Sequence, residues 1–96
     1  MKILKPGHSY RLASADESGP SQDIDFVRGP AEARESMGTT NEEVLCMLID
    51  RMKFLNSEVP CEESEIVIHN LESALLALHV RTMNRKSRGV EGTNQA

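Results

Sequence analysis

The stretch between Pro60 and Gly89 constrains the fold most, because its roughly 28 consecutive residues include no proline and no glycine. At 1.5 Å per residue, an uninterrupted helix of this length extends roughly 40 Å. Pro60 suits the first turn of such a helix, where its missing N–H costs nothing, and the acidic residues after it suit the positive end of the helix dipole. The sequence therefore predicts one long helix that ends near Gly89.

This helix is expected to have two apolar faces. On a helical wheel, the residues of one face are Val67, Ile68, Leu71, Leu75 and Leu78. Leu76, Val80 and Met83 form a second face turned well away from the first, so one partner helix cannot cover both. Either the N-terminal strands cover the second face, or it is an interface between subunits. The interface suits a chain of 96 residues, whose own core is thin.

A shorter helix is predicted before the long one, starting after Thr40 and running to about Asn56. The hydroxyl of Thr40 can accept the backbone N–H three residues on, while Glu43 can reach back to the N–H of Thr40, which makes a capping box. The apolar stripe of this helix consists of Val44, Leu45, Leu48, Met52 and Leu55, widened by Met47, Ile49 and Phe54. Two helices joined by a short turn form an antiparallel hairpin.

The first third of the chain predicts two short strands. His8, Tyr10 and Leu12 alternate with polar residues, and Ile24 and Phe26 do so after a Gly-Pro turn. From Gly29-Pro30 to Gly38, small and charged residues indicate a loop. The fold class is therefore mainly α (α+β): a long antiparallel helical hairpin, preceded by a short N-terminal β-ribbon and assembling as a homo-oligomer. We expect one domain overall, with the ribbon and connector in 1–38 and the hairpin, with a Gly-containing C-terminal motif, in 39–96.

Charge and cysteine content exclude several classes of protein. Residues 1–11 and 81–96 each carry a net charge of +3, whereas residues 12–80 carry four bases against fourteen acids, so no broad basic surface is available for a nucleic acid polymer. Cys46 and Cys61 have no zinc-like spacing with a histidine, and we expect both to be reduced packing residues. The spacing of the cysteines and histidines predicts no metal site, and we expect no cofactor. No signal peptide or membrane span is visible, which predicts a cytoplasmic protein without a membrane partner.

The end of the long helix carries three arginines on one stripe. Arg81, Arg85 and Arg88 are spaced i, i+4 and i+7, an arrangement in which like charges repel. Their role is either to complement the negative end of the helix dipole or to clamp a phosphate. Gly-Val-Glu-Gly-Thr follows, ending at Thr93, and two glycines so close allow exposed N–H groups beside the arginines. This composition favours the phosphate clamp.

The sequence from Gly38 to Thr93 resembles a phage family of hairpin-domain sponges that antagonise the Thoeris and CBASS defence systems. The matching segments are Gly38-Thr39-Thr40-Asn41-Glu42-Glu43-Val44-Leu45, Leu48-Ile49-Asp50-Arg51-Met52, Pro60-Cys61, Leu71-Glu72, Ala74-Leu75, Arg81-Thr82, Asn84-Arg85 and Arg88-Gly89-Val90-Glu91-Gly92-Thr93. Pro6-Gly7-His8 with Tyr10, and Phe26-Val27, look like the β-ribbon of the anti-Thoeris branch.

The resemblance implies a function and a set of ligands. Proteins of this family bind cyclic ADP-ribose isomers, cyclic dinucleotides and cyclic trinucleotides without turnover, and they assemble through their helices into dimers and hexamers. We therefore expect an anti-defence sponge that forms a dimer-based hexamer in the cytoplasm of the infected bacterial host. Such a protein needs no catalytic residue and no cofactor.

The resemblance also assigns roles to individual residues. Arg81 and Arg85 are expected to hold the phosphates of cyclic trinucleotides where subunits meet, with Arg88 and Thr93 beside them. Phe54 matches an aromatic residue that stacks on a base in a separate pocket between subunits, and Arg28 matches a basic residue there.

The match is imperfect at that second pocket. Ser64 stands where the family tends to have asparagine, Glu62 where a basic residue is common, and Ala77 where an aromatic residue is frequent. An acidic side chain beside a phosphate weakens anion binding. The resemblance therefore points more strongly to Arg81 and Arg85 than to this pocket.

Two other functions stand as alternatives to sequestration, a nucleotide hydrolase and a helical-hairpin adaptor. A nucleotide hydrolase would need a general base or a metal set, and no histidine or carboxylate cluster of that kind is evident. A helical-hairpin adaptor that binds another protein fits the excess of apolar residues. Sequestration needs only complementary pockets, and the sequence supplies arginine, aromatic, threonine and glycine residues for them.

Overall fold

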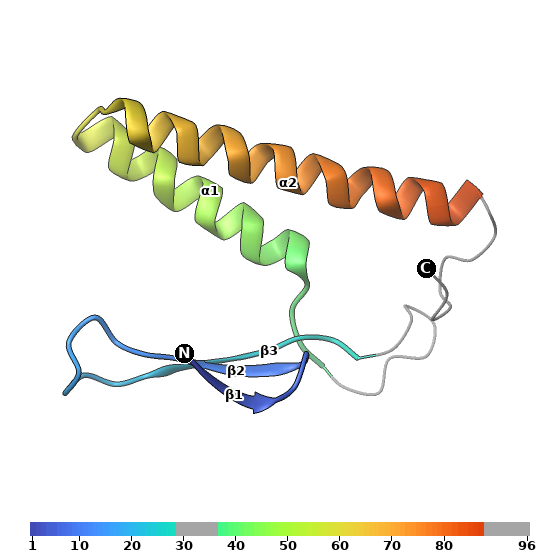
Figure 1. Cartoon of the computed structure of the whole chain (residues 1–96), viewed down its shortest axis with the longest axis horizontal. Coiled ribbons are helices and arrows are strands. Elements are labelled where there is room, and N and C mark those ends of the chain that lie inside the picture. Colours follow the sequence, from blue (N-terminus) through green and yellow to red (C-terminus); the bar gives the residue numbers. More distant parts are fainter. Residues whose placement is uncertain (29–36, 88–96) are drawn as a thin grey trace. The chain divides into compact units, whose positions relative to one another are not determined.

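The computed structural model describes residues 1–28 and 37–87 and contains three strands followed by two helices (Figure 1). Its contacts divide the chain into two compact units. The first unit comprises Met1–Thr40 and holds the sheet, and the second begins at Asn41 and holds the helices. The predicted fold class, α+β with a helical hairpin after a short β-structure, is confirmed.

The sheet has three antiparallel strands in the order β1-β2-β3: β1 is Lys2–Lys5, β2 is Ser9–Leu12 and β3 is Gln22–Asp25. The prediction of two strands was therefore wrong by one, since β1 was missed. The sequence KILK of β1 does not alternate apolar and polar residues, which is the pattern that marks a half-buried strand, and every residue of β1 is exposed. Tertiary pairing with β2 makes it a strand.

A tight turn joins β1 to β2. The N–H of His8 donates to the carbonyl of Lys5 at 2.9 Å, and Pro6 and Gly7 occupy the two central positions. Proline supplies the fixed φ of the first position, and Gly7 has φ of +77° at the second, as a type II turn requires. The Pro-Gly pair thus sets the direction in which β2 returns along β1.

The register gives the sheet one apolar and one polar face. Ile3, Tyr10 and Ile24 are partners across the three strands and share a face, because paired residues point the same way. The pairing continues past β3, where the N–H of Phe26 donates to the carbonyl of His8 at 2.8 Å. The rings of Tyr10 and Phe26 meet edge to face with centroids 5.9 Å apart. The half-buried side chains of Tyr10, Ile24 and Phe26, all from predicted strands, thus form the small core of this unit.

On the polar face, Arg11 and Asp23 form a two-pronged ion pair. Arg11 Nε lies 2.8 Å from Asp23 Oδ1, and Arg11 Nη2 lies 3.0 Å from Asp23 Oδ2. The two residues are direct cross-strand partners. The hydrogen bond from Arg11 lowers the pKa of Asp23, and the same bond raises the pKa of Arg11.

The segment before the first helix returns to the sheet. Thr39 forms a parallel bridge with Phe26: its N–H donates to the carbonyl of Asp25 at 2.8 Å, and its carbonyl accepts the N–H of Val27 at 3.0 Å. A Cβ on Gly38 would lie 2.6 Å from the carbonyl oxygen of Asp25, so only glycine permits this approach. Most of the predicted connecting loop, residues 29–36, lies outside the described residues.

The helices form the predicted hairpin. Helix α1 is Asn41–Glu58 and helix α2 is Glu62–Ser87. Thr40 directly precedes α1, where the capping prediction placed it, and α1 runs two residues past the expected end at Asn56. In Figure 1 the helices are close at the turn and separate toward the start of α1. The predicted end of the long helix, near Gly89, lies outside the described residues.

The turn between the helices is held by hydrogen bonds. Asn56 Oδ1 accepts the N–H of Cys61 at 3.0 Å, and the N–H of Val59 donates to the carbonyl of Leu55. The carbonyl of Cys61 accepts the N–H of Glu65 at 3.3 Å, so Cys61 is the residue that begins the helical ladder. Pro60 therefore lies before α2, and its predicted place in the first helical turn was wrong.

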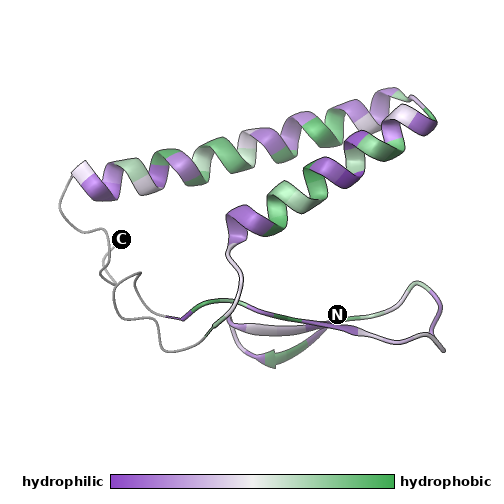
Figure 2. Ribbon diagram, turned by 180° about the vertical axis from the view of Figure 1, so that it is seen from behind, coloured by the Kyte–Doolittle hydropathy of each residue, from purple (hydrophilic) through white to green (hydrophobic). Residues whose placement is uncertain are grey.

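The core of the hairpin is thin. Among the described residues, Ile49, at 8% exposure, is the only buried hydrophobic side chain. Four residues of the first predicted face of α2 are half-buried, namely Ile68, Leu71, Leu75 and Leu78, whereas Val67, which was predicted for the same face, is 40% exposed. Figure 2 shows apolar residues recurring along both helices between polar ones. Many of them remain exposed, so the hairpin has more apolar surface than it covers.

Candidate functional site

The arginine stripe lies on the last turns of α2. Arg81 is exposed and Arg85, one turn later, is half-buried. Their position suits cations, because the carbonyl end of a helix carries partial negative charge. Planar guanidinium groups one turn apart can also hold two oxygens of a phosphate. Arg88 and Thr93, the other residues predicted for this site, lie outside the described residues.

Phe54 lies on the outer side of α1. Its side chain is 61% exposed, and it stands five positions after the buried Ile49, which places it about 140° round the helix. Phe54 is therefore not part of the hairpin core, and its ring is available for stacking. Ser57 Oγ donates to the carbonyl of Phe54 at 2.6 Å, one turn before the end of α1.

Ser64 lies in the first turn of α2. It is half-buried, and its Oγ is 3.1 Å from Cys61 Sγ. Glu62, which departs from the family pattern, is exposed at the start of the same helix. Both residues follow the turn between the helices, and Phe54 lies shortly before that turn.

The predicted site residues thus occupy different parts of the fold. From Ser64 to Arg81, helix α2 advances about 26 Å at 1.5 Å per residue, so the two places are distinct within one chain. Arg28 is half-buried after β3 and belongs to the other compact unit.

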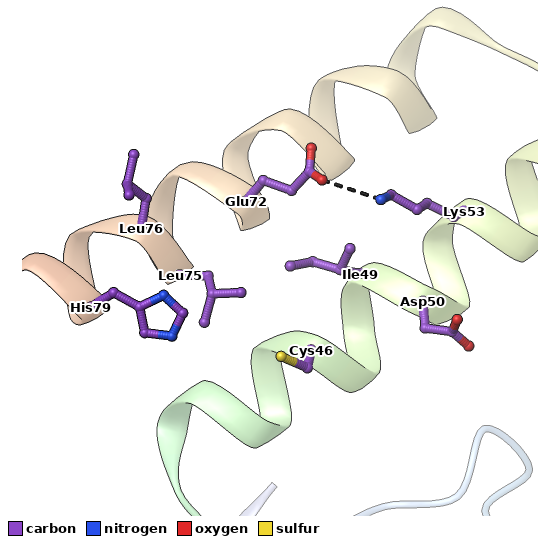
Figure 3. A pocket seen from close by; sticks show the side chains of 8 residues that line it. All are labelled: Cys46, Ile49, Asp50, Lys53, Glu72, Leu75, Leu76 and His79. Atoms are coloured by element: carbon purple, nitrogen blue, oxygen red, sulfur yellow. Dashed lines mark ion pairs between the residues drawn. The ribbon is translucent and has the colours of Figure 1, made fainter.

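An open groove of about 370 Å³ lies between the helices (Figure 3). Lys53 Nζ is 3.2 Å from Glu72 Oε2 across it, and both side chains are about half exposed. The residues that line the groove are Cys46, Ile49, Asp50, Lys53, Glu72, Leu75, Leu76 and His79. Its floor is apolar and its rim carries both signs of charge, so it has no preference for an anion.

The groove does not contain the predicted site residues. Arg81 follows His79 by two residues and therefore lies about 160° from it round α2, on the other side of the hairpin. Sequence reasoning missed the groove, since Lys53 and Glu72 are on different helices and only the hairpin register brings them together. No local spacing could have revealed that pair.

The two cysteines are not packing residues. Cys46 and Cys61 are free and exposed, Cys46 on the groove and Cys61 just before α2, which corrects the expectation that both are packing residues.

Among residues 1–28 and 37–87, no three histidine, cysteine or carboxylate side chains are grouped as a metal site requires. Neither helix in that part of the chain is long and apolar enough to cross a membrane.

Comparison with known proteins connects the chain to a phage protein. No protein-family model matches the sequence. The chain is similar to Thoeris anti-defense 1 of Bacillus phage SBSphiJ7, with 38% identity over 90 residues, which cover 93% of this chain and 63% of that protein. The chain thus spans less than two thirds of its relative's length. Over most of its own length it is a relative of a phage anti-Thoeris protein, which supports the anti-Thoeris branch of the family that the sequence motifs indicate.

Proposed function

We propose that this protein acts against Thoeris immunity in a phage-infected bacterium by binding cyclic nucleotide messengers and withholding them unchanged. The observation that carries the proposal is the similarity, over 93% of this chain, to a phage protein named for anti-Thoeris defence. The messenger classes are cyclic ADP-ribose isomers and cyclic di- and trinucleotides, as the resemblance implies. The place of action is the cytoplasm of the host.

The side chains at the end of α2 support this function. Arg81 and Arg85 present two guanidinium groups one turn apart, and a cyclic trinucleotide carries several phosphates for them to pair with. Phe54 offers an exposed ring to a base. Sequestration asks for contacts of this kind and needs no general base, metal or cofactor.

Assembly of several copies is part of the proposal. Nanomolar retention, about -12 kcal/mol, needs several desolvated contacts together. Arginines of neighbouring subunits would supply them in a dimer-based hexamer. The exposed apolar side chains of both helices provide the surface for such assembly.

The proposal is tested by ligand release. The protein is mixed in turn with glycocyclic ADP-ribose, a cyclic dinucleotide and cyclic triadenylate, free ligand is removed, and the protein is denatured by heat. Recovery of intact ligand supports sequestration. Recovery of altered ligand identifies an enzyme, and recovery of none identifies a protein without these ligands, such as a helical-hairpin adaptor.

Paired variants locate the site. Arg81→Ala with Arg85→Ala is expected to abolish retention of cyclic triadenylate while the assembly keeps its size. Arg51→Ala, which removes an exposed arginine from α1, is the matched control and should retain the ligand. Phe54→Ala tests the other pocket separately, with glycocyclic ADP-ribose as the probe. Unchanged retention in the double arginine variant would place the phosphate site elsewhere.

A further inference from the structure

A second open pocket, of about 410 Å³, lies within the first compact unit, beside the end of β2. Its volume falls in the range of pockets that hold small metabolites, about 300–1,000 Å³. One wall comes from the sheet and the other from the loop between β2 and β3, which extends past the strands in Figure 1. The lining residues include Lys2, Arg11, Ser14, Glu17, Gly19 and Ser21.

Two cationic side chains stand next to each other at this pocket. Lys2 of β1 and Arg11 of β2 are direct cross-strand partners, so their side chains leave the same face of the sheet. Like charges in this arrangement repel each other and destabilise a sheet. Asp23 offsets the charge of Arg11 through Nε and Nη2, but Nη1 takes no part in that ion pair. Lys2 has no ion pair among the described residues, so an anion between the two cations would relieve the repulsion.

The loop adds hydroxyl groups in a fixed arrangement. Asp16 Oδ1 accepts the N–H of Ser18 at 3.1 Å, and the N–H of Gly19 donates to the carbonyl of Asp16 at 2.8 Å. A Cβ on Gly19 would lie 2.5 Å from Ser14 Oγ, so glycine lets the two arms of the loop meet there. Ser14 and Ser21, one on each arm, therefore line the pocket without a ligand, which lowers the ordering cost of binding.

One acidic side chain also lines the pocket. Glu17 is exposed in the loop, and an ionised carboxylate only accepts hydrogen bonds. It repels a bare anion, whereas a sugar hydroxyl can donate to it, as ribose hydroxyls do to acidic side chains in dinucleotide sites. Cations, hydroxyl groups and one carboxylate together suit a ligand that carries both a phosphate and hydroxyls.

We propose that this pocket binds a small phosphorylated sugar, of which ribose 5-phosphate is the simplest example. Lys2, Nη1 of Arg11 and the serine hydroxyls hold the phosphate, and Glu17 accepts the hydroxyls of the sugar. The site belongs to the sheet unit, whereas the residues of the proposed sequestration, Arg81 and Phe54 among them, belong to the helices. It is therefore a binding site beyond the proposed function.

A titration with ribose 5-phosphate, followed by two-dimensional NMR of the backbone amides, tests the site. Exposed charges contribute little each, so we expect a dissociation constant on the order of a millimolar at low salt. The amide signals of Ser14, Gly19 and Ser21 should shift. Inorganic phosphate alone and ribose alone should each bind at least about fivefold more weakly, because each lacks half of the contacts.

A matched pair of lysine variants tests the phosphate contact. Lys2→Gln is expected to weaken binding of ribose 5-phosphate at least about fivefold. Lys5→Gln is the control, because Lys5 is also exposed on β1 and carries the same charge but does not line the pocket. It should change binding less than about twofold. Equal losses in the two variants would mean general attraction to a basic strand and overturn the proposal.

Glu17→Gln tests the sugar contact, with an effect of opposite sign on the two ligands. Removing the carboxylate charge should strengthen binding of inorganic phosphate, since the repulsion is lost. The preference for ribose 5-phosphate over inorganic phosphate should fall at the same time. An unchanged preference, or equal binding of the two ligands by the unaltered protein, overturns the assignment to a sugar phosphate. The amide spectrum of each variant confirms that the sheet is folded.

The double variant Arg81→Ala, Arg85→Ala separates this inference from the proposed function. It should lose cyclic triadenylate but keep the ribose 5-phosphate shifts at Ser14, Gly19 and Ser21. Loss of those shifts would place the sugar phosphate on α2 and overturn the pocket. Shifts that persist in a protein that retains no cyclic nucleotide support the pocket and contradict sequestration.

Discussion

The backbone of Thr39 is bonded to that of Asp25, with the nitrogen of Thr39 2.8 Å from the carbonyl oxygen of Asp25. Thr39 lies only two residues before α1, so this bond ties the chain to the sheet immediately before the helical hairpin begins. Because a Cβ on Gly38 would collide with the same carbonyl, the bond depends on glycine at that position.

Gly38→Ala is therefore expected to destabilise the sheet unit by about 1–3 kcal/mol. Either the new methyl group forces the carbonyl of Asp25 away, or the bridge to Thr39 opens. Amide hydrogen exchange should become faster at Thr39 and Val27, the two donors of the bridge. Gly7→Asn is the control: nothing lies within 4 Å of a Cβ there, and asparagine tolerates the positive φ. Slow exchange at Thr39 in Gly38→Ala would refute the steric argument.

Phe26→Ala should destabilise the sheet unit by about 2 kcal/mol, because it removes the ring that meets Tyr10 edge to face. Tyr10 is the only tyrosine, and the chain has no tryptophan, so near-UV circular dichroism reports on this contact. Phe54→Ala is the matched change on an exposed ring and should leave the tyrosine signal as it is. Equal signals in both variants would count against the contact.

The ion pair of Arg11 and Asp23 makes part of the sheet's stability depend on pH. Because Arg11 lowers the pKa of Asp23 in the folded state, the contribution is present above the ordinary value of 3.8 and is lost as the pH falls through the lowered value. Both side chains are exposed, so the effect is small and decreases with salt.

Arg11→Gln is expected to return the pKa of Asp23 toward its ordinary value in an NMR titration of the side-chain carboxyl. Asp16 is an internal control, since the backbone N–H of Ser18 lowers its pKa and Arg11 takes no part. If Asp23 titrates identically in both proteins, the pair does not form in solution.

Asn56→Ala should lower the stability of the hairpin by about 1 kcal/mol, because it removes the acceptor for the N–H of Cys61 at the turn. Asn56→Asp keeps an acceptor oxygen and should retain most of the stability. Urea unfolding followed by far-UV circular dichroism compares the two. The same loss in both variants would mean that the bond to Cys61 is not what stabilises the turn.

The candidate site was predictable where it depends on helical spacing. Arg81 and Arg85 were expected on one stripe of the long helix, and both lie on α2 one turn apart. The exposure of Phe54 was not decided by spacing, because a phenylalanine on an apolar helix is more often core. The groove beside Glu72 was not predictable, since its second wall comes from another helix.

The sequence alone determined where the helices lie and which strands β2 and β3 would be, because these depend on local periodicity, capping and turn residues. Tertiary structure decided what local patterns do not encode. Pairing with β2 made a strand of the fully exposed KILK segment, the bridge to Asp25 required Gly38, and the hairpin register brought Lys53 to Glu72. Each of these contacts joins segments that are distant in the chain, and its free energy is gained only when the segments meet.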